Sequence, residues 1–312
     1  MPPMLRLALP KGRITEEVVK LLAAAGLPVR SNGRSYRPQV SEEGIEAKYL
    51  KPQNIPRLIE IGAHDCGFTG HDWVVESGAD VVQVLDTGLD PVILVAAAPE
   101  DSRPAGTPEG SSPAGTPAGS GTAAPMEGSP VPASPGRPLI VASEYENITR
   151  RYLDGRGRSY LFIRTFGATE VFPPEDADMI LDLVATGTTL RENHLVVVDE
   201  VLKSSTRFVA SRAALAEPEK AERIDMLRTL MQAALEARRR VLLEMNVARE
   251  RLAAVVDVLP AMKSPTIQEL YGGKGYAVKA AVPRDGLPGV ILRLRQAGAT
   301  DLIAYALEKV IP

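Results

Sequence analysis

A compositional break in the chain separates two blocks of ordinary globular composition. Between Ser102 and Gly136 nearly every residue is Pro, Gly, Ser, Thr or Ala, and Met126 and Val131 are the only larger apolar side chains. Such a segment buries too little apolar surface to offset the entropy that is lost on ordering. We therefore predict a disordered surface insertion over 99–137, with ordered structure before and after it.

Apolar runs alternate with helical patterns on both sides of this break. Strands are predicted at 4–9, 45–50, 65–69, 81–85, 92–97, 139–142, 159–164, 179–184, 196–201 and 207–210. Helices are predicted at 14–25, 54–61, 148–153, 169–171 and 217–239. Strands separated by helices of this length indicate βαβ units and a mostly parallel sheet. Two such blocks predict a bilobed α/β protein with a ligand-binding cleft between its lobes.

The last part of the chain follows a different pattern. Strand, helix, strand, strand, helix and strand are predicted at 240–247, 249–259, 266–270, 275–282, 287–297 and 301–310. This βαββαβ order is that of ferredoxin-like domains. The chain is thus expected to divide into a first lobe over 1–98, to which it returns over 200–238, the insertion over 99–137, a second lobe over 138–199 and a C-terminal domain over 239–312.

Composition and charge exclude several classes of protein. The 36 Lys and Arg residues against 39 Asp and Glu leave a net charge of -3, which gives no basis for nucleic-acid binding. The single cysteine, Cys66, excludes an intrachain disulfide and favours a reducing compartment. No apolar run has the length of a membrane span, and the N-terminal residues lack the pattern of a signal peptide. We expect a cytoplasmic enzyme or small-molecule binder, with no nucleic-acid or membrane partner.

The strongest chemical signal follows the buried strand over 179–184. The turn Ala185-Thr186-Gly187-Thr188-Thr189 leads into a helical start, so backbone N–H groups and three hydroxyls converge there on an anion. Asp182 stands just before the turn, where it can accept hydrogen bonds from ribose hydroxyls. A helix cap explains a lone Thr-Gly-Thr-Thr equally well. The strand, the aspartate and the hydroxyls together favour phosphoribosyl binding.

Segments along nearly the whole chain, apart from 99–137, resemble the ATP phosphoribosyltransferase family in its long, self-regulated form. The segment 182–190 is similar to the phosphoribosyl-pyrophosphate loop of that family, and 259–266 is similar to its regulatory domain. Further matching blocks are Lys11-Gly12-Arg13, Asp65-Cys66-Gly67-Phe68-Thr69-Gly70-His71-Asp72, Tyr145–Tyr152 and Gly167-Ala168-Thr169-Glu170. The proline-rich stretch is longer than the connector expected between the lobes.

The resemblance implies a fold and an activity. The fold is a two-lobed, periplasmic-binding-protein-like catalytic unit followed by a ferredoxin-like regulatory domain. The activity is transfer of the 5-phosphoribosyl group from phosphoribosyl pyrophosphate to N1 of ATP, with release of pyrophosphate, as the first step of L-histidine biosynthesis. The resemblance also implies Mg²⁺ carried by pyrophosphate and water, with no protein ligand assigned. It implies feedback inhibition by L-histidine and a homo-oligomer, from dimer to hexamer, without a separate regulatory subunit.

The same resemblance assigns residues to these roles. Catalytic roles fall to Asp182 and Glu170, and phosphoribosyl-pyrophosphate binding falls to Asp182 and the turn 185–189. ATP or pyrophosphate would contact Lys11, Arg13, Gly67, Thr69 and Gly70, and histidine would contact Asn246, Ser264 and Thr266. Plain alternatives are solvated charges for Lys11 and Arg13, a capping acid for Glu170, and turn or cap residues in the C-terminal domain.

Two other classes of function stay open on the residues alone. A bilobed small-molecule-binding protein without catalysis shares the expected architecture, although it would not release pyrophosphate. A transcriptional effector domain has a similar architecture too, but the sequence shows neither a helix-turn-helix nor a basic segment.

Overall fold

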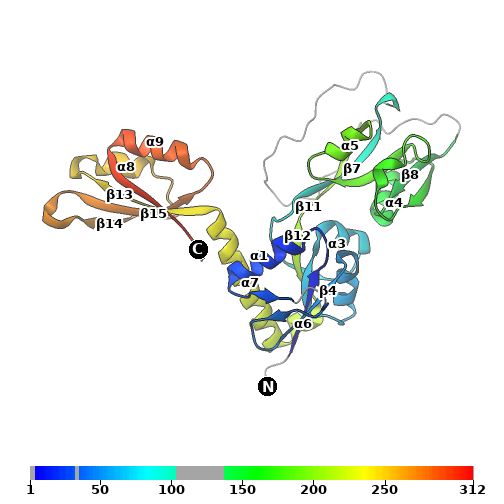
Figure 1. Cartoon of the computed structure of the whole chain (residues 1–312), viewed down its shortest axis with the longest axis horizontal. Helices are drawn as coiled ribbons and strands as arrows, with labels where there is room; N and C mark the ends of the chain where they lie inside the picture. Colours follow the sequence, from blue (N-terminus) through cyan, green and yellow to red (C-terminus); the bar gives the residue numbers. More distant parts are fainter. Residues whose placement is uncertain (1–3, 32–34, 103–136, 312) are drawn as a thin grey trace. The chain divides into compact units, whose positions relative to one another are not determined.

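The computed structural model describes residues 4–31, 35–102 and 137–311 (Figure 1). Of the insertion expected over 99–137, residues 103–136 lie outside the described residues, so that part remains a prediction. Its first residues are a correction, because Pro99 ends β7 (Val92–Pro99) and η2 covers Glu100–Ser102. The chain forms two compact units. One comprises Leu5–Glu17 and Ala47–Glu217, and the other comprises mainly Val18–Glu46 and the chain from Pro218 onward.

The first sheet contains five strands in the order β4-β1-β5-β12-β6. Their bounds are Ile45–Leu50, Leu5–Pro10, Cys66–Gly70, Thr206–Ala210 and Val82–Asp86. Strands β1 and β5 are parallel, whereas β12 is antiparallel to both β5 and β6. The elements beside this sheet include η1 (Pro52–Asn54), α2 (Ile55–Glu60), α3 (His71–Ser77) and α6 (Arg212–Ala216). Buried Ile55 and Ile59 of α2 pack with Ala8, Val74 and Val209. We call this sheet and its helices lobe I.

The second sheet has the order β11-β7-β10-β8-β9. Its strands span Leu195–Ser204, Val92–Pro99, Met179–Val184, Leu139–Ser143 and Tyr160–Arg164. Strands β10, β8 and β9 are parallel, and β7 runs antiparallel between β10 and β11. The remaining elements are η2 (Glu100–Ser102), α4 (Glu146–Asp154), η3 (Thr169–Val171) and α5 (Thr188–Glu192). Alternate apolar residues of the strands pack against α4, where Ile148, Tyr152 and Leu153 are buried. We call this sheet and its helices lobe II.

The strand pairing corrects the expected boundaries of the lobes. The sequence placed 92–97 in the first lobe, but β7 pairs with β10 along its length and belongs to lobe II. All of β11 also lies in lobe II, so the chain returns to the first sheet at β12 rather than at residue 200. Strands β7 and β11 are both rich in β-branched residues, and such an apolar run carries no signal of which sheet it joins. The sheets are also mixed rather than mostly parallel, because β7, β11 and β12 run antiparallel to their neighbours.

The other unit contains α7 (Pro218–Arg238), most of α1 (Thr15–Ala25) and the short pair β2 (Val29–Arg30) and β3 (Gln39–Val40). Helix α7 buries an apolar stripe that includes Ile224, Leu227 and Met231. Its Arg223 donates hydrogen bonds to the carbonyl oxygens of Glu43 and Gly44, which fixes that loop against the helix.

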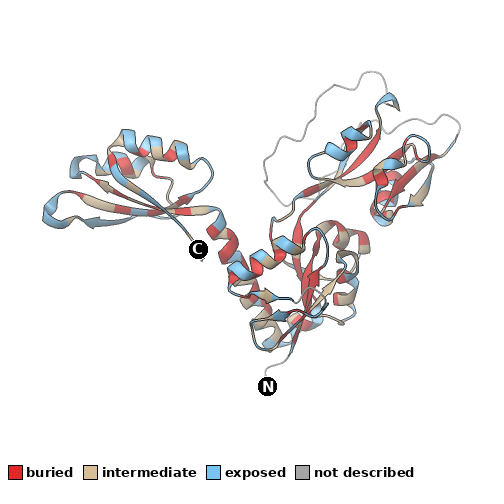
Figure 2. Cartoon of the chain, viewed as in Figure 1, coloured by how far each residue is buried: buried red, intermediate tan, exposed pale blue. Residues whose placement is uncertain are grey.

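The C-terminal domain has the βαββαβ order that the sequence predicts. Its elements are β13 (Arg240–Val247), η4 (Arg249–Arg251), α8 (Leu252–Val258), β14 (Thr266–Glu269), η5 (Tyr271–Gly273), β15 (Tyr276–Pro283), α9 (Leu287–Ala297) and β16 (Ala299–Ala306). The sheet order β14-β15-β13-β16 is antiparallel throughout, as in ferredoxin-like domains. Buried and more exposed residues alternate along β13, and the buried set packs against α8 and α9 (Figure 2).

Candidate functional site

The ends of three parallel strands gather the chemistry-bearing residues of lobe II. Because β8, β9 and β10 run in one direction, their carboxyl ends meet at the same edge of the sheet. Glu144 follows β8, the segment that leads to Glu170 follows β9, and the turn 185–189 follows β10. Ligands of α/β sheets commonly bind at this edge. The structure therefore brings Asp182, Glu170 and the turn into one region, as expected.

The turn after β10 is open to solvent and shaped by its glycine. Gly187 has φ +74°, a left-handed conformation that side chains rarely adopt, and it precedes the short helix α5. Thr186, Thr188 and Thr189 are largely exposed, and the hydroxyls of Thr186 and Thr188 lie 3.1 Å apart. These hydroxyls and the backbone of the turn are thus available to an anion.

Arg191 adds a positive charge that the sequence analysis missed. Its guanidinium folds back over the turn and donates to the Thr186 carbonyl oxygen and to the Thr188 hydroxyl, both at 3.3 Å. The signal available in the sequence was the arginine one helical turn after Gly187, since residues three and four apart share a helix face.

Asp182 is a half-buried carboxyl group with an unusual proton affinity. Its pKa is raised to about 6, mainly by burial; a hydrogen bond from the Leu183 N–H opposes this rise, and the negative charges of Glu170 and Glu144 add to it. That N–H lies 2.7 Å from Oδ1 of Asp182. The carboxylate therefore lies within the electrostatic range of Glu170 and Glu144, and it is mostly ionised only above about pH 6.

A buried pair of threonines fixes the segment that carries Glu170. The hydroxyls of Thr165 and Thr169 lie 2.8 Å apart, and both side chains are buried. Between them, Gly167 has φ +100° and Ala168 has φ +49°, so the chain reverses sharply before Glu170. This arrangement holds Glu170 in η3, which contacts β10.

Lys11 and Arg13 are exposed at the end of β1 in lobe I. Gly12, with φ +123°, makes the turn between them. The Gly12 N–H donates a hydrogen bond of 2.8 Å to the Thr15 hydroxyl. The positive charge of Arg13 acts on Asp90, whose pKa is raised mainly by burial and partly lowered by Arg13. Arg13 therefore lies close to the segment that crosses from β6 to β7.

Gly67, Thr69 and Gly70 have structural roles within lobe I. All three are buried in β5. A Cβ at Gly67 would collide with Ala8 at 2.6 Å, and the Thr69 hydroxyl donates to the Pro52 carbonyl oxygen at 2.9 Å. A Cβ at Gly70 would collide with Oδ1 of Asp72. Their residue types therefore follow from packing, and contact of these residues with ATP or pyrophosphate stays a prediction.

The three residues expected to bind histidine lie at the outer surface of the C-terminal domain. Thr266 lies opposite Lys279 and Asn246 lies opposite Ala277, so both point to the same face of the sheet with β15 between them. The Asn246 amide donates to Asp301 at 2.9 Å. Ser264 is exposed in the loop before β14. No contact joins the three among the described contacts.

Metal cages and membrane-spanning helices are both absent from the described residues. Within these parts of the chain, no group of three His, Cys, Asp or Glu side chains is arranged to hold a metal ion. None of the helices in 4–31, 35–102 and 137–311 combines the length and the apolar character that a bilayer crossing requires.

A two-lobed α/β unit with a hydroxyl-rich turn, an aspartate and an arginine at one sheet edge is typical of α/β proteins that bind phosphate groups. The comparisons with known proteins narrow this class. A family described as ATP phosphoribosyltransferase matches residues 51–233, and one described as HisG, C-terminal domain, matches residues 237–309.

Relatives match over the full length. An ATP phosphoribosyltransferase of Desulforudis audaxviator is 37% identical, with 99% of each chain covered. One of Thermodesulfovibrio yellowstonii is 35% identical, again with 99% of each covered. A chain of the ATP phosphoribosyl transferase (HisG:HisZ) complex from Thermotoga maritima has the same fold, with a TM-score of 0.57 at 24% identity, covering 73% of this chain and 99% of that one.

This chain belongs to the ATP phosphoribosyltransferase family. It is a transferase of the first step of histidine biosynthesis, in the long form that carries a C-terminal domain. The alternative of a bilobed binding protein without catalysis is not favoured.

Proposed function

We propose that this chain performs the family reaction at the lobe II sheet edge, with ATP and phosphoribosyl pyrophosphate as its substrates. The observation that carries the proposal is the open turn 185–189, which lies beside Asp182 and beneath the guanidinium of Arg191. The 5-phosphate of phosphoribosyl pyrophosphate binds the turn through backbone N–H groups and threonine hydroxyls. Arg191 contributes a charge that suits a phosphate.

Asp182 binds the ribose in this proposal. Its carboxylate accepts hydrogen bonds from the ribose hydroxyls, and a bond to an ionised acceptor is stronger than one between neutral groups. Because burial holds the pKa of Asp182 at about 6, the group is ionised at neutral pH but not far from its titration point. Glu170 faces the same region and stabilises positive charge that develops on the ribose ring during transfer.

The chemistry at C1 requires positioning more than proton transfer. N1 of the adenine has an available lone pair, so it attacks C1 without a general base while the bond to pyrophosphate breaks. The transition state carries oxocarbenium character, which carboxylates stabilise electrostatically. Lys11 and Arg13 are exposed cations suited to the phosphates of ATP or to pyrophosphate.

Mg²⁺ fits this region as an ion carried by the substrate. It prefers oxygen ligands and usually keeps several waters. Asp182 lies within electrostatic range of both Glu170 and Glu144, but no three such side chains within the described ranges form a cage. This donor set suits an ion held mainly by pyrophosphate and water, with Asp182 or Glu170 as the protein contact. When bound, the ion neutralises charge on the leaving pyrophosphate.

Regulation by L-histidine belongs to the C-terminal domain in this proposal. The T. maritima neighbour was solved as a HisG:HisZ complex. The structural match includes 99% of that chain but only 73% of this one. This chain carries the further domain at 237–309. We therefore expect that inhibition needs no separate regulatory subunit, and that Asn246, Ser264 and Thr266 contact histidine.

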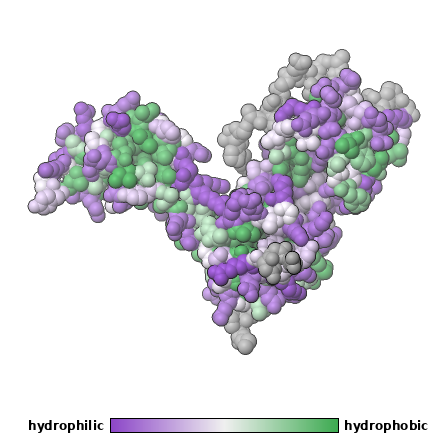
Figure 3. Space-filling view, viewed as in Figure 1, coloured by the Kyte–Doolittle hydropathy of each residue, from purple (hydrophilic) through white to green (hydrophobic). Residues whose placement is uncertain are grey.

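Self-association is part of the same proposal. Strand β16 is an edge of its sheet and leaves Ile303 and Tyr305 49% and 45% exposed. Figure 3 shows hydrophobic surface on this domain. An exposed edge strand with large apolar side chains favours pairing with a second copy. We expect a homo-oligomer, from dimer to hexamer, in the cytoplasm.

The test is a pyrophosphate-release assay on the purified full-length chain. Release is expected when ATP, phosphoribosyl pyrophosphate and Mg²⁺ are all present, and it should fall when L-histidine is added. Omission of ATP is the control for hydrolysis of phosphoribosyl pyrophosphate. Binding of both substrates without any release would instead support a binding protein.

A further inference from the structure

Helix α3 of lobe I presents two buried carboxylates to the start of α4 in lobe II. Asp72 and Glu76 are four residues apart on α3 and only 3% and 6% exposed. Buried carboxylates are uncommon in proteins unless they are paired or hydrogen-bonded. Both belong to the same compact unit as the residues that they contact.

Asp72 joins three segments of the chain. Its Oδ2 accepts a hydrogen bond of 2.9 Å from the Tyr145 hydroxyl, which comes just before α4. Its Oδ1 accepts one of 2.5 Å from the hydroxyl of Ser204, the last residue of β11 before the chain crosses to lobe I. The Asp72 N–H donates to the same hydroxyl at 3.0 Å. Burial, followed by the charge of Asp72, raises the pKa of Tyr145, so its hydroxyl keeps the proton that it donates.

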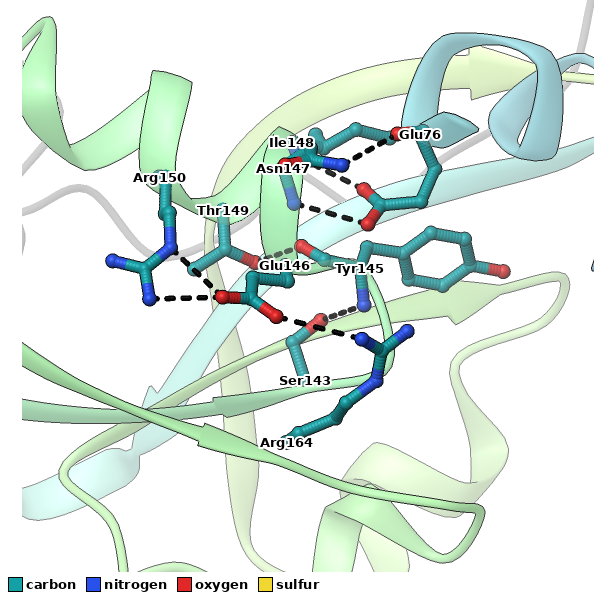
Figure 4. Close-up of polar contacts among 9 residues, drawn as sticks. All are labelled: Glu76, Ser143, Tyr145, Glu146, Asn147, Ile148, Thr149, Arg150 and Arg164. Atoms are coloured by element: carbon teal, nitrogen blue, oxygen red, sulfur yellow. Dashed lines mark hydrogen bonds and ion pairs between the residues drawn. The ribbon is translucent and has the colours of Figure 1, made fainter. Parts of the chain in front are cut away.

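Glu76 caps α4 from the other lobe (Figure 4). Its two carboxylate oxygens accept hydrogen bonds of 3.0 Å from the N–H groups of Asn147 and Ile148. The side-chain amide of Asn147 donates to the Glu76 carbonyl oxygen at 2.9 Å. Tyr145, the N-cap of α4, makes no side-chain cap of its own. The first turn of α4 therefore depends on a carboxylate of lobe I.

These contacts lead from one candidate substrate region to the other. Helix α3 begins directly after Gly70, at the end of β5. On the other side, the Tyr145 N–H donates to the Ser143 hydroxyl at 3.0 Å (Figure 4). That hydroxyl donates to the Leu181 carbonyl oxygen at 2.7 Å, and Leu181 immediately precedes Asp182. Three hydrogen bonds, joined by short covalent stretches of chain, thus link the end of β5 to the residue proposed to bind ribose.

We propose that Asp72 and Tyr145 are positioning residues that align the two lobes for transfer. They hold the end of β5 at a fixed orientation to Asp182 and the turn 185–189, so that the attacking nitrogen and C1 meet. Small displacements of aligned reactants lower the rate strongly, whereas the contacts that bind each substrate are kept. Glu76 serves the same alignment through α4. This inference rests on the proposed function.

The same helix offers a matched control. The Tyr152 hydroxyl donates to Oδ2 of Asp199 at 3.0 Å, and both residues belong to lobe II. Tyr145→Phe and Tyr152→Phe each remove one tyrosine-to-aspartate hydrogen bond of similar length from a mostly buried site. They differ in that only the first bond crosses between the lobes.

The experiment measures steady-state kinetics and Tm of both variants against the parent. Tyr145→Phe should lower kcat about tenfold and leave KM for ATP and for phosphoribosyl pyrophosphate within about twofold. Tyr152→Phe should lower Tm comparably and keep kcat within about twofold. A merely structural role predicts the same kcat for both variants, and that result would overturn the proposal.

Two further variants keep the test decisive. Asp72→Asn combined with Tyr145→Phe should lose little more kcat than Asp72→Asn alone, because the two residues act through one bond. Additive losses would contradict the pairing. If Tyr145→Phe does not fold, Glu76→Gln tests the alignment by the same split between kcat and KM, and an unchanged kcat would then overturn the proposal. An inactive parent would contradict the proposed function itself, which is a separate outcome.

Discussion

Gly67 and Ala8 lie directly opposite each other in the parallel pair of β5 and β1. A Cβ on Gly67 would stand 2.6 Å from both the Cβ and the carbonyl oxygen of Ala8. Real Cβ atoms do not approach so closely, so one of the strands would have to shift. Packing between β1 and β5 is thus sufficient to explain why residue 67 is a glycine, independent of any ligand.

Gly67→Ala should therefore act on stability and not on substrate affinity. Overpacking of a buried site costs about 1–3 kcal/mol, which lowers Tm by several degrees. KM for ATP should stay unchanged in the folded variant at low temperature. If the variant instead had the Tm of the parent and a raised KM for ATP, that result would contradict the packing explanation and support contact of Gly67 with ATP.

Asp182→Asn should separate function from stability. Loss of the charge weakens the bonds to ribose, so kcat/KM for phosphoribosyl pyrophosphate should fall at least about tenfold. The substitution should also stabilise the free protein above pH 6. Because the folded-state pKa of about 6 lies above the unfolded value of about 3.9, ionisation opposes folding, by up to about 3 kcal/mol.

The stability gain has its own pH window. It should be absent below about pH 4, where both states hold the proton, and complete above about pH 6. Thermal melting of both proteins at several pH values measures it. A lower Tm for Asp182→Asn at pH 8 would show that the carboxylate is a structural acceptor.

The pH dependence of the parent enzyme provides a separate prediction. With the pKa of Asp182 held at about 6 by burial, kcat/KM for phosphoribosyl pyrophosphate should fall as pH drops through that value. The residual activity of Asp182→Asn serves as the control, since titration of the substrate itself affects both proteins. An identical acid limb in the two profiles would exclude Asp182 as its source.

Inhibition by histidine is expected to depend on the outer face of the C-terminal domain. Ser264→Ala combined with Thr266→Ala should raise the histidine concentration needed for inhibition, while activity without histidine holds or rises. The expectation follows because histidine can shift the equilibrium between an active and an inhibited arrangement of the protein only if it binds one of them more tightly. If the double variant were inhibited as strongly as the parent, Ser264 and Thr266 would not be histidine contacts, and the site would lie elsewhere in this domain.

Local patterns predicted most of the elements, and the turn between β10 and α5, well. Strands 179–184 and 240–247 and helix 287–297 appear with the expected bounds, because their apolar spacing and end residues are local signals. The sequence could not predict that β7 joins the sheet of lobe II, because buried apolar strands have the same sequence pattern in either sheet. The contacts of Asp72 with Tyr145 and of Glu76 with Asn147 join residues more than seventy positions apart. Such pairing leaves no periodicity in the sequence.

The most direct test of the account is identification of the product that carries the phosphoribosyl group. The full-length chain is incubated with ATP, phosphoribosyl pyrophosphate and Mg²⁺, and adenine-containing species are measured by mass spectrometry alongside released pyrophosphate. The account predicts one phosphoribosyl group added to ATP for each pyrophosphate released, with both products formed more slowly and in the same ratio by Asp182→Asn. Release of pyrophosphate without a phosphoribosylated ATP, or no release at all, would contradict it.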